Sequence, residues 1–359
     1  MDVSSHFRDF PAILTGGKRV YGKLQWMGQG VFGTVILYRQ WGTMNQVAVK
    51  FLDKFRGLEE SKILEKIKKY DPDKNNLLKL KEHFEFNLDY CIISEKLDQD
   101  ILHYMCDITL EPLTVSEIRP IAQQLLVALK ALKSYGIVHT DIKPDNIMFV
   151  NHEKYPFKVK LIDFGLARNV FDLNRMTLIQ PLGYRAPEVV FGLPKDESVD
   201  MWGLGCSLAF MYLLRNLYPK TSVYEYIFFV CNGNHFKFKT PSEYVEFRSL
   251  LKQMLCVNSK DRITPEEALR HDFITMKHLS KRKEHYATLA HNLMSVCSCI
   301  YTHQRICRST RTCCIKNQMT LMVNLHGAWP TVQMRQLLML SQCKNKESRN
   351  LGVERSKAW

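Results

Sequence analysis

The chain has 359 residues, of which 46% are hydrophobic, and a formal net charge of +14 at neutral pH. This is enough apolar material for a sizeable core, and the length is typical of about two domains. No apolar run approaches the roughly 20 residues of a membrane span, and the first residues lack the basic start and apolar stretch of a secretion signal, so neither a membrane-spanning nor a secreted protein is expected.

The first part of the chain carries strand patterns around one helix. Residues 23–40 hold two short apolar runs joined by glycines, and residues 46–52, QVAVKFL, form an alternating β-branched run; both predict antiparallel strands. Residues 58–70 place apolar side chains at helical spacing against charged ones, and residues 90–97 return to a strand pattern.

After residue 97 the sequence pattern predicts mainly helices. Three capping-box signatures, each a threonine with a glutamate three residues later, mark helix starts at Thr114 with Glu117, Thr240 with Glu243 and Thr264 with Glu267. The sequence therefore predicts an α+β fold: a strand-rich N-terminal lobe with one helix, a mainly helical C-terminal lobe, and a cleft between them.

Three glycines at the first predicted turn form a GxGxxG pattern: Gly28, Gly30 and Gly33. Without side chains they let backbone N–H groups approach phosphate oxygens, although a tight hairpin would use the same residues. A Rossmann dinucleotide loop is disfavoured, because a strand follows instead of a helix and Lys50 arrives instead of an acid.

Lys50 lies in the strand VAVKFL and, beside a glycine loop, can reach the α- and β-phosphates of a nucleotide. Glu60, on the following helix, is the candidate counter-charge, and its neighbour Glu59 is the alternative. A solvated helix face is the other interpretation of either glutamate.

The stretch HTDIKPDN (139–146) and the later DFG together suggest phosphoryl-transfer chemistry. Asn146 and Asp163 carry hard oxygen ligands suited to Mg²⁺. Asp141 is then available to accept the proton of an attacking hydroxyl, while Lys143 neutralises charge on the transferred phosphoryl group.

With these motifs in this order, the sequence resembles the eukaryotic protein kinases over residues 18–276. The motifs are GQGVFGTV, VAVK, HTDIKPDN, DFG and RAPE, and Lys143 is similar to the serine/threonine class. Within the kinases, YRAPEVVFGLP and DMWGLGCSLAF resemble the homeodomain-interacting protein kinases and their dual-specificity relatives of the CMGC group. This implies a bilobal kinase fold with an N-lobe at 18–95, a C-lobe at 98–276, an N-terminal extension at 1–17 and a tail at 277–359.

The resemblance also implies roles for individual residues. Catalytic roles fall on Lys50, Glu60, Asp141 and Lys143, and metal binding on Asn146 and Asp163. ATP would be held by the glycine loop, namely Gly28, Gln29, Gly30, Val31, Phe32 and Gly33, and by Val35, Ala48, Lys50, Ser94, Glu95, Leu97, Asn146, Met148 and Asp163. Structural support would come from Glu188 paired with Arg262, from Asp200 beneath the catalytic loop, and from a stack of Leu64, His139 and Phe164.

Several positions depart from the family pattern. Thr140 replaces an arginine that often precedes the catalytic aspartate, and Leu178 falls where the relatives autophosphorylate a tyrosine, which leaves Thr177 as a possible site of modification. Ser94, behind the adenine, replaces a bulky aromatic, so we expect tolerance of bulky purine substituents. Only 61 residues separate Asp200 from Arg262, fewer than the group usually has, which predicts a missing helical insert.

The tail from residue 277 is expected to be basic and irregular. Residues 281–359 contain thirteen Lys/Arg against three Asp/Glu, and six of the eleven cysteines fall from Cys297 on. The irregular cysteine spacing favours reduced thiols over a disulfide framework and gives no orderly zinc pattern. The basic surplus without aromatic interleaving predicts no specific nucleic-acid binding.

Two classes of function fit the sequence. One is a serine/threonine kinase that uses ATP and Mg²⁺, acts on proteins such as transcription regulators, and is located in the nucleus or cytoplasm. The other is a pseudokinase or scaffold with little turnover. Retention of Lys50, Asp141, Asn146 and Asp163 together favours the kinase, because a scaffold has no chemical need for all four. The sequence does not indicate an oligomeric state.

Overall fold

The structure, a computed structural model, describes residues 10–30, 33–176, 178–231, 244–279 and 288–295. The chain divides into two units, Met1–Tyr301 and Thr302–Trp359, and every described residue belongs to the first. Among these residues no helix has the length and apolar character needed to cross a membrane.

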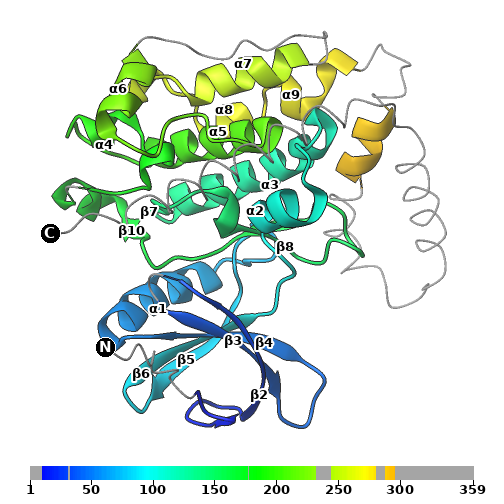
Figure 1. The fold of residues 1–359 in the computed structure, drawn as a ribbon, viewed down its shortest axis with the longest axis vertical. Helices are drawn as coiled ribbons and strands as arrows, with labels where there is room; N and C mark the ends of the chain where they lie inside the picture. The colour runs from blue at the N-terminus through cyan, green and yellow to red at the C-terminus, as the bar shows by residue number, and fades with distance from the viewer. Residues whose placement is uncertain (1–9, 31–32, 177, 232–243, 280–287, 296–359) are drawn as a thin grey trace, which may run out of the picture. The chain divides into compact units, whose positions relative to one another are not determined.

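An antiparallel sheet of six strands forms the N-terminal lobe, in the order β1-β2-β3-β4-β6-β5 (Figure 1). In β4, Val47, Val49 and Phe51 are buried in the core of this lobe, whereas Lys50 lies on the opposite face because side chains alternate along a strand. The strands are β1 (Ile13–Leu14), β2 (Tyr21–Gln29), β3 (Thr34–Gln40), β4 (Gln46–Leu52), β5 (Leu80–Phe86) and β6 (Asp89–Glu95).

Helix α1 (Lys54–Lys68) packs against this sheet. Asp53 caps it by accepting a hydrogen bond from the N–H of Arg56, which satisfies one of the free donors of the first turn. A side chain at Gly57 would lie 2.4 Å from the Tyr90 side chain, so glycine allows α1 to approach β6 closely. This approach directs Glu60 inward from α1.

The C-terminal lobe is mainly helical, and α3 and α5 lie side by side in it (Figure 1). The capping boxes at Thr114 and Thr264 are present as predicted, and the one predicted at Thr240 lies outside the described residues. A π-helical turn covers Tyr104–Thr109. The helices are α2 (Ile101–His103), α3 (Val115–Ser134), α4 (Pro187–Val190), α5 (Ser198–Leu213), α6 (Val223–Cys231), α7 (Val245–Met254), α8 (Pro265–Ala268) and α9 (Asp272–Thr275).

Four short strands frame the stretch HTDIKPDN. β7 (Ile137–Val138) pairs with β10 (Arg168–Asn169), and β8 (Ile147–Phe149) pairs with β9 (Val159–Leu161). Residues 139–146 therefore link β7 to β8, and Asp163 follows the end of β9. The strand-rich lobe with one helix and the helical lobe confirm the predicted α+β fold.

Part of the segment expected to be an irregular tail is helical. Residues 288–295 form a helix, and Leu293 lies in the same apolar core as α3 and α5. The rest of the tail beyond residue 279, with all of its cysteines, lies outside the described residues, as do residues 1–9 of the N-terminal extension. Residues 232–243, within the stretch where the helical insert is expected to be missing, also lie outside them.

Candidate active site

Lys50 of β4 contacts two carboxylates from different parts of the chain. Its Nζ lies 2.8 Å from Glu60 Oε2 on α1 and 2.8 Å from Asp163 Oδ1 after β9. Glu60 is 2% exposed, whereas Glu59 is only partly buried and pairs with Lys62. Of the two candidate glutamates, Glu60 is therefore the one that contacts Lys50.

Electrostatics favour the charged forms of Lys50 and Asp163. Burial alone would lower the pKa of Lys50, but Glu60 and Asp163 outweigh it and raise the pKa. Burial likewise opposes ionisation of Asp163, yet the Lys50 ammonium holds the pKa of that carboxyl below its ordinary value. Asp163 has a left-handed backbone, with φ of +59°, which a non-glycine residue adopts only where its surroundings hold it.

Asp200 at the start of α5 holds the loop 139–146 from beneath. Its carboxylate accepts hydrogen bonds from the backbone N–H of His139 at 2.7 Å and of Thr140 at 2.9 Å. Thr140 has φ of +66°, and its hydroxyl donates to the carbonyl of Leu166. A short threonine side chain thus points to the segment after DFG, in place of the arginine that the family pattern suggests.

All three side chains of the predicted stack are buried, and two of them, His139 and Phe164, are in ring contact. Leu64, His139 and Phe164 are each 0% exposed, and the rings of His139 and Phe164 lie 5.0 Å apart. His139 Nε2 donates to the carbonyl of Ile162 while Nδ1 accepts from the N–H of Asp141, so the ring is neutral, and burial lowers its pKa. This packing fixes the peptide on which Asp141 is carried.

Asp141 is 3% exposed, and its two carboxylate oxygens have different surroundings. Oδ2 accepts a hydrogen bond from Asn146 Nδ2 at 2.8 Å and lies 3.2 Å from Lys143 Nζ. Oδ1 is buried and has no hydrogen-bond partner within the described part of the chain. A buried acceptor without a donor is costly, and a substrate hydroxyl would satisfy it.

The residues expected around adenine converge on β4 and β6. Ala48 and Ser94 are directly paired in the sheet, and Ser94 Oγ lies 3.4 Å from the carbonyl of Ala48. Val35 of β3 pairs with Lys50 of β4, and Leu97, just beyond β6, is 3% exposed. Met148, on β8, belongs to the C-terminal lobe.

The glycine loop joins β2 to β3, and Gly28 and Gln29 are the last residues of β2. The N–H of Gly30 donates to the carbonyl of Gly33 at 2.9 Å. A Cβ at Gly28 would meet no atom within 4 Å, and one at Gly30 would meet only the Gly33 carbonyl at 3.9 Å, so crowding within the chain does not require glycine at either position. Val31 and Phe32 lie outside the described residues.

A second charged cluster, not foreseen from the sequence, lies behind the adenine-side strands. Lys160 of β9 is 3% exposed, and its Nζ lies 2.5 Å from both Asp73 Oδ1 and Glu95 Oε1. Lys79 Nζ contacts the other Asp73 oxygen at 2.6 Å. A lysine inside the apolar run KVKLI is the only local sign of this cluster.

Arg262 and Glu188 form a buried bidentate pair, as the resemblance suggested. The distances are 2.6 Å from Arg262 Nη1 to Glu188 Oε1 and 2.9 Å from Nη2 to Oε2. The guanidinium also lies 5.2 Å from the Trp202 ring centroid. The pair connects α4 to the segment before α8 and supports the chain that follows the DFG motif.

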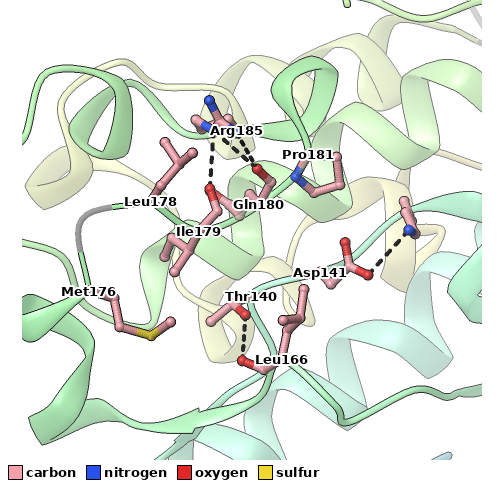
Figure 2. A pocket seen from close by; sticks show the side chains of 10 residues that line it. Thr140, Asp141, Leu166, Met176, Leu178, Ile179, Gln180, Pro181 and Arg185 are labelled. Atoms are coloured by element: carbon pink, nitrogen blue, oxygen red, sulfur yellow. Dashed lines mark hydrogen bonds and ion pairs between the residues drawn. The ribbon is translucent and has the colours of Figure 1, made fainter. Parts of the chain in front are cut away.

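A pocket of about 290 Å³ opens beside Asp141, between the loop 139–146 and the segment 176–181 (Figure 2). We call it the acceptor pocket. Its walls are mostly apolar, from Leu166, Met176, Leu178, Ile179 and Pro181, and Thr140, Asp141 and Lys143 also line it. Thr177 lies outside the described residues.

Arg185 fixes the backbone above this pocket. Its Nε and Nη2 donate to the carbonyl of Gln180 at 3.0 and 2.7 Å (Figure 2). Gln180 has φ of +64°, and its side-chain oxygen accepts from the N–H of Ala186. The Gln180 carbonyl is thus already engaged within the chain.

Comparison with known proteins gives a consistent result. The family model of the protein kinase domain matches residues 21–274. The chain is 30% identical over 361 residues to homeodomain-interacting protein kinase 1 of Caenorhabditis elegans. This match covers 77% of this chain and 43% of the relative. It is 30% identical to homeodomain-interacting protein kinase 2 of Mesocricetus auratus, in a match that covers 74% of this chain and 29% of that relative. It is 29% identical to homeodomain-interacting protein kinase 4 of Homo sapiens, in a match that covers 75% of this chain and 58% of that relative.

The matched region therefore spans between 29% and 58% of the length of these relatives. A solved crystal structure of a kinase domain has a TM-score of 0.66 and 23% identity, and the match covers 74% of this chain and 98% of that one. At this identity the likeness supports the fold, which is the bilobal arrangement predicted from the motifs.

Proposed function

This chain belongs to the protein kinase family, and we propose that it transfers the γ-phosphoryl group of ATP to serine and threonine hydroxyls of proteins. One observation carries the proposal. Lys50 contacts both Glu60 and Asp163 at 2.8 Å while Asp141 and Asn146 are hydrogen-bonded to each other, so the charged groups that the reaction needs are already assembled.

The nucleotide would lie against the glycine loop and Lys50. Because the space at Gly28 and Gly30 is open, phosphate oxygens can approach the backbone of this loop closely. The Lys50 ammonium would bind the α- and β-phosphates, and Ala48, Val35 and Met148 would sandwich the adenine. Backbone groups of Glu95 and Leu97 would hydrogen-bond its edge.

Mg²⁺ would be held by Asp163 and Asn146. No group of three or more His, Cys, Asp or Glu suited to a metal occurs among the residues that the structure describes. A site with one carboxylate and one amide oxygen fits Mg²⁺ all the same, because this ion retains water and takes further ligands from substrate phosphates. When bound, it neutralises charge on the phosphate oxygens.

Asp141 would orient the acceptor hydroxyl and receive its proton at Oδ1, the oxygen that lacks a partner. Burial raises the pKa of Asp141 even though Lys143 and Asn146 oppose the shift, which makes the carboxylate a better proton acceptor. Lys143, whose Nζ lies 3.2 Å from Oδ2, would stabilise negative charge on the phosphoryl group in transit.

The backbone at Gln180 supports a preference for proline after the target residue. Any residue other than proline that follows the target serine or threonine carries a backbone N–H that needs an acceptor. The carbonyl of Gln180 cannot serve as a free acceptor, because it already receives hydrogen bonds from Arg185. Proline has no N–H, so it leaves no donor unsatisfied. We therefore propose sites in which proline follows the serine or threonine.

The names of the relatives point to proteins with homeodomains as partners. We extend this to the present chain as a proposal, with transcription regulators as substrates and the nucleus or cytoplasm as the place of action. The assembled Lys50, Glu60 and Asp163 favour turnover over a purely scaffolding role, because a scaffold would not need a lysine held between two carboxylates.

Transfer from labelled ATP to a generic basic protein, in the presence of Mg²⁺, tests the proposal. The wild-type chain is expected to label the protein, and Asp141→Asn and Lys50→Met are each expected to lose at least about a hundredfold in rate. Labelling that is equal in all three proteins, or absent from the wild type, would contradict it.

A further inference from the structure

The hairpin that joins β3 to β4 exposes large apolar side chains. Trp41 is 67% exposed and Met44, in the same turn, is 80% exposed. Val20 is 39% exposed, and its carbonyl accepts a hydrogen bond from the N–H of Trp41 at 2.8 Å. We call these three residues the hairpin patch. Single exposed apolar residues are common on proteins, whereas a cluster that includes tryptophan is typical of an interaction site.

The alternation of the strands places a cation beside this patch. Tyr38 of β3 is buried in the core of the N-terminal lobe, so Arg39 lies on the opposite face, where it pairs with Gly22 of β2. By the same period of two, Trp41 and Val20 continue this face at the ends of the two strands. Arg39 is exposed there, next to apolar side chains.

The chain around the hairpin patch carries only positive charge. No Asp or Glu occurs from residue 10 to residue 52. Lys18, Arg19 and Arg39 are exposed and form no ion pair with a carboxylate in the described part of the chain. Glu82 of β5 is in contact with this segment, but there it accepts the backbone N–H of Lys18 at 2.8 Å. A partner that matches the charge of this surface is therefore anionic.

Hydrogen bonds hold the turn in one shape. The N–H of Gln40 donates to the carbonyl of Asn45 at 2.9 Å. The hydroxyl of Thr43 donates to the carbonyl of Gln40 at 3.0 Å and accepts from the N–H of Asn45 at 3.1 Å. Gly42 has φ of +71°, a left-handed backbone that favours glycine. A surface that is already ordered loses little conformational entropy when it binds a partner.

The composition of the surface selects among anionic partners. Met44 and Val20 have no ring on which a nucleic-acid base could stack, so a nucleic acid would leave them uncovered. The acyl region of a bilayer accepts apolar side chains of any shape, and tryptophan is favoured at the boundary between lipid and water. We propose that the hairpin patch binds the surface of membranes that contain anionic lipids, with Trp41 and Met44 in the lipid and Arg19 and Arg39 at the headgroups.

The hairpin patch is separate from the residues of the reaction. Arg39 lies four residues along β3 from Val35, or about 13 Å at the usual rise of a strand. Substitutions in the patch should therefore leave phosphoryl transfer unchanged. The inference also stands or falls independently of the proposed function, because lipid binding is measured without ATP.

Co-sedimentation of the full chain with lipid vesicles tests the inference. One set of vesicles contains three parts of phosphatidylcholine to one part of phosphatidylserine, and the other contains phosphatidylcholine alone. The wild type is expected to bind the anionic vesicles at least about tenfold more tightly. Trp41→Ser combined with Met44→Ser, and Arg19→Gln combined with Arg39→Gln, should each weaken this binding by about tenfold or more.

The matched control is Leu88→Ser. Leu88 is 87% exposed in the β5–β6 hairpin of the same lobe, but Asp89 follows it, so this variant should bind as the wild type does. The basic tail beyond residue 279 is a second source of attraction to anionic lipid. The variant at Trp41 and Met44 separates the two sources, because its charge is unchanged. Thermal melts that match the wild type would show that each variant is folded.

Three results would overturn the inference. The first is a wild type that binds neither set of vesicles or binds both equally. The second is a variant at Trp41 and Met44 that binds anionic vesicles as tightly as the wild type, which would assign the binding to the tail. The third is binding to a single-stranded oligonucleotide that depends on the hairpin patch, without binding to vesicles, which would make nucleic acid the partner.

Discussion

Replacing Lys50 by methionine should destabilise the fold as well as stop catalysis. Glu60 is 2% exposed, so without the ammonium its carboxylate would be buried beside Asp163 with no cation in contact. Removing one partner of a buried ion pair typically costs about 3–5 kcal/mol. For a domain of this size each kcal/mol lowers Tm by about 2–4 °C, so Lys50→Met should melt about 6–20 °C below the wild type.

The matched control is Lys54→Met, four residues away. Lys54 Nζ also lies 2.8 Å from a carboxylate, that of Glu85, but these side chains are 62% and 52% exposed. An exposed pair contributes at most about 1 kcal/mol, so this variant should melt within a few degrees of the wild type. The two lysines differ in burial and not in distance, which isolates the effect of desolvation.

A compensating variant separates the charge effect from lost packing. Lys50→Met combined with Glu60→Met removes both buried charges of the pair, and apolar replacement of such a pair is often neutral. Thermal melts by circular dichroism at neutral pH should show the double variant more stable than Lys50→Met, though still inactive. A Lys50→Met protein that melts like Lys54→Met, or a double variant with no recovery, would refute the reasoning.

Three further predictions concern other sites. Ser94→Phe should weaken an inhibitor with a bulky purine substituent by at least about tenfold, because ring volume would fill the space behind the adenine, and equal inhibition of both proteins would argue against this. Arg262→Leu should lower the free energy of unfolding in urea by about 3–5 kcal/mol because it leaves Glu188, 3% exposed, as a buried unpaired carboxylate; a loss below about 1 kcal/mol would contradict the role of the pair. Lys50 lowers the pKa of Asp163, so ionised Asp163 adds stability above its ordinary pKa near 4, and this stability is lost as the pH falls below that value. The urea midpoint of Asp163→Asn should therefore fall less steeply with acidification than that of the wild type. Equal slopes of urea midpoint against pH in the two proteins would count against this.

Local patterns were sufficient for the residues that lie close to their own motif. The alternation of QVAVKFL placed Lys50 on the face opposite the N-lobe core, and the charged residues of the following helix supplied Glu59 and Glu60 as its two candidate partners. The capping boxes at Thr114 and Thr264 were legible because a capping interaction spans only three residues. The choice of Glu60 over Glu59 needed the structure, since both lie in one turn and only packing selects between them.

Features made by distant residues left little trace in the sequence. Lys160 meets Asp73 and Glu95 across 87 and 65 positions, and no periodicity connects them. The left-handed backbone of Gln180 could not be predicted from the sequence, because the residue is not a glycine. Hydrogen bonds that Gln180 accepts from Arg185 and from the N–H of Ala186 hold this conformation. The acceptor pocket likewise brings together Thr140 and Asp141 with Ile179 and Pro181, which come from separate segments of the chain.

The measurement that tests the account most directly compares ATP binding with phosphoryl transfer in the same protein preparations. Wild type and Asp141→Asn would be titrated with ATP and Mg²⁺ by calorimetry, and the preformed complexes would then be mixed with a serine peptide in a single-turnover experiment. The account predicts similar ATP affinity in both proteins and a transfer rate at least about a hundredfold lower in Asp141→Asn, because Asp141 acts on the acceptor and not on the nucleotide. Wild type that binds ATP but transfers no phosphate, or an Asp141→Asn protein that transfers at the wild-type rate, would contradict it.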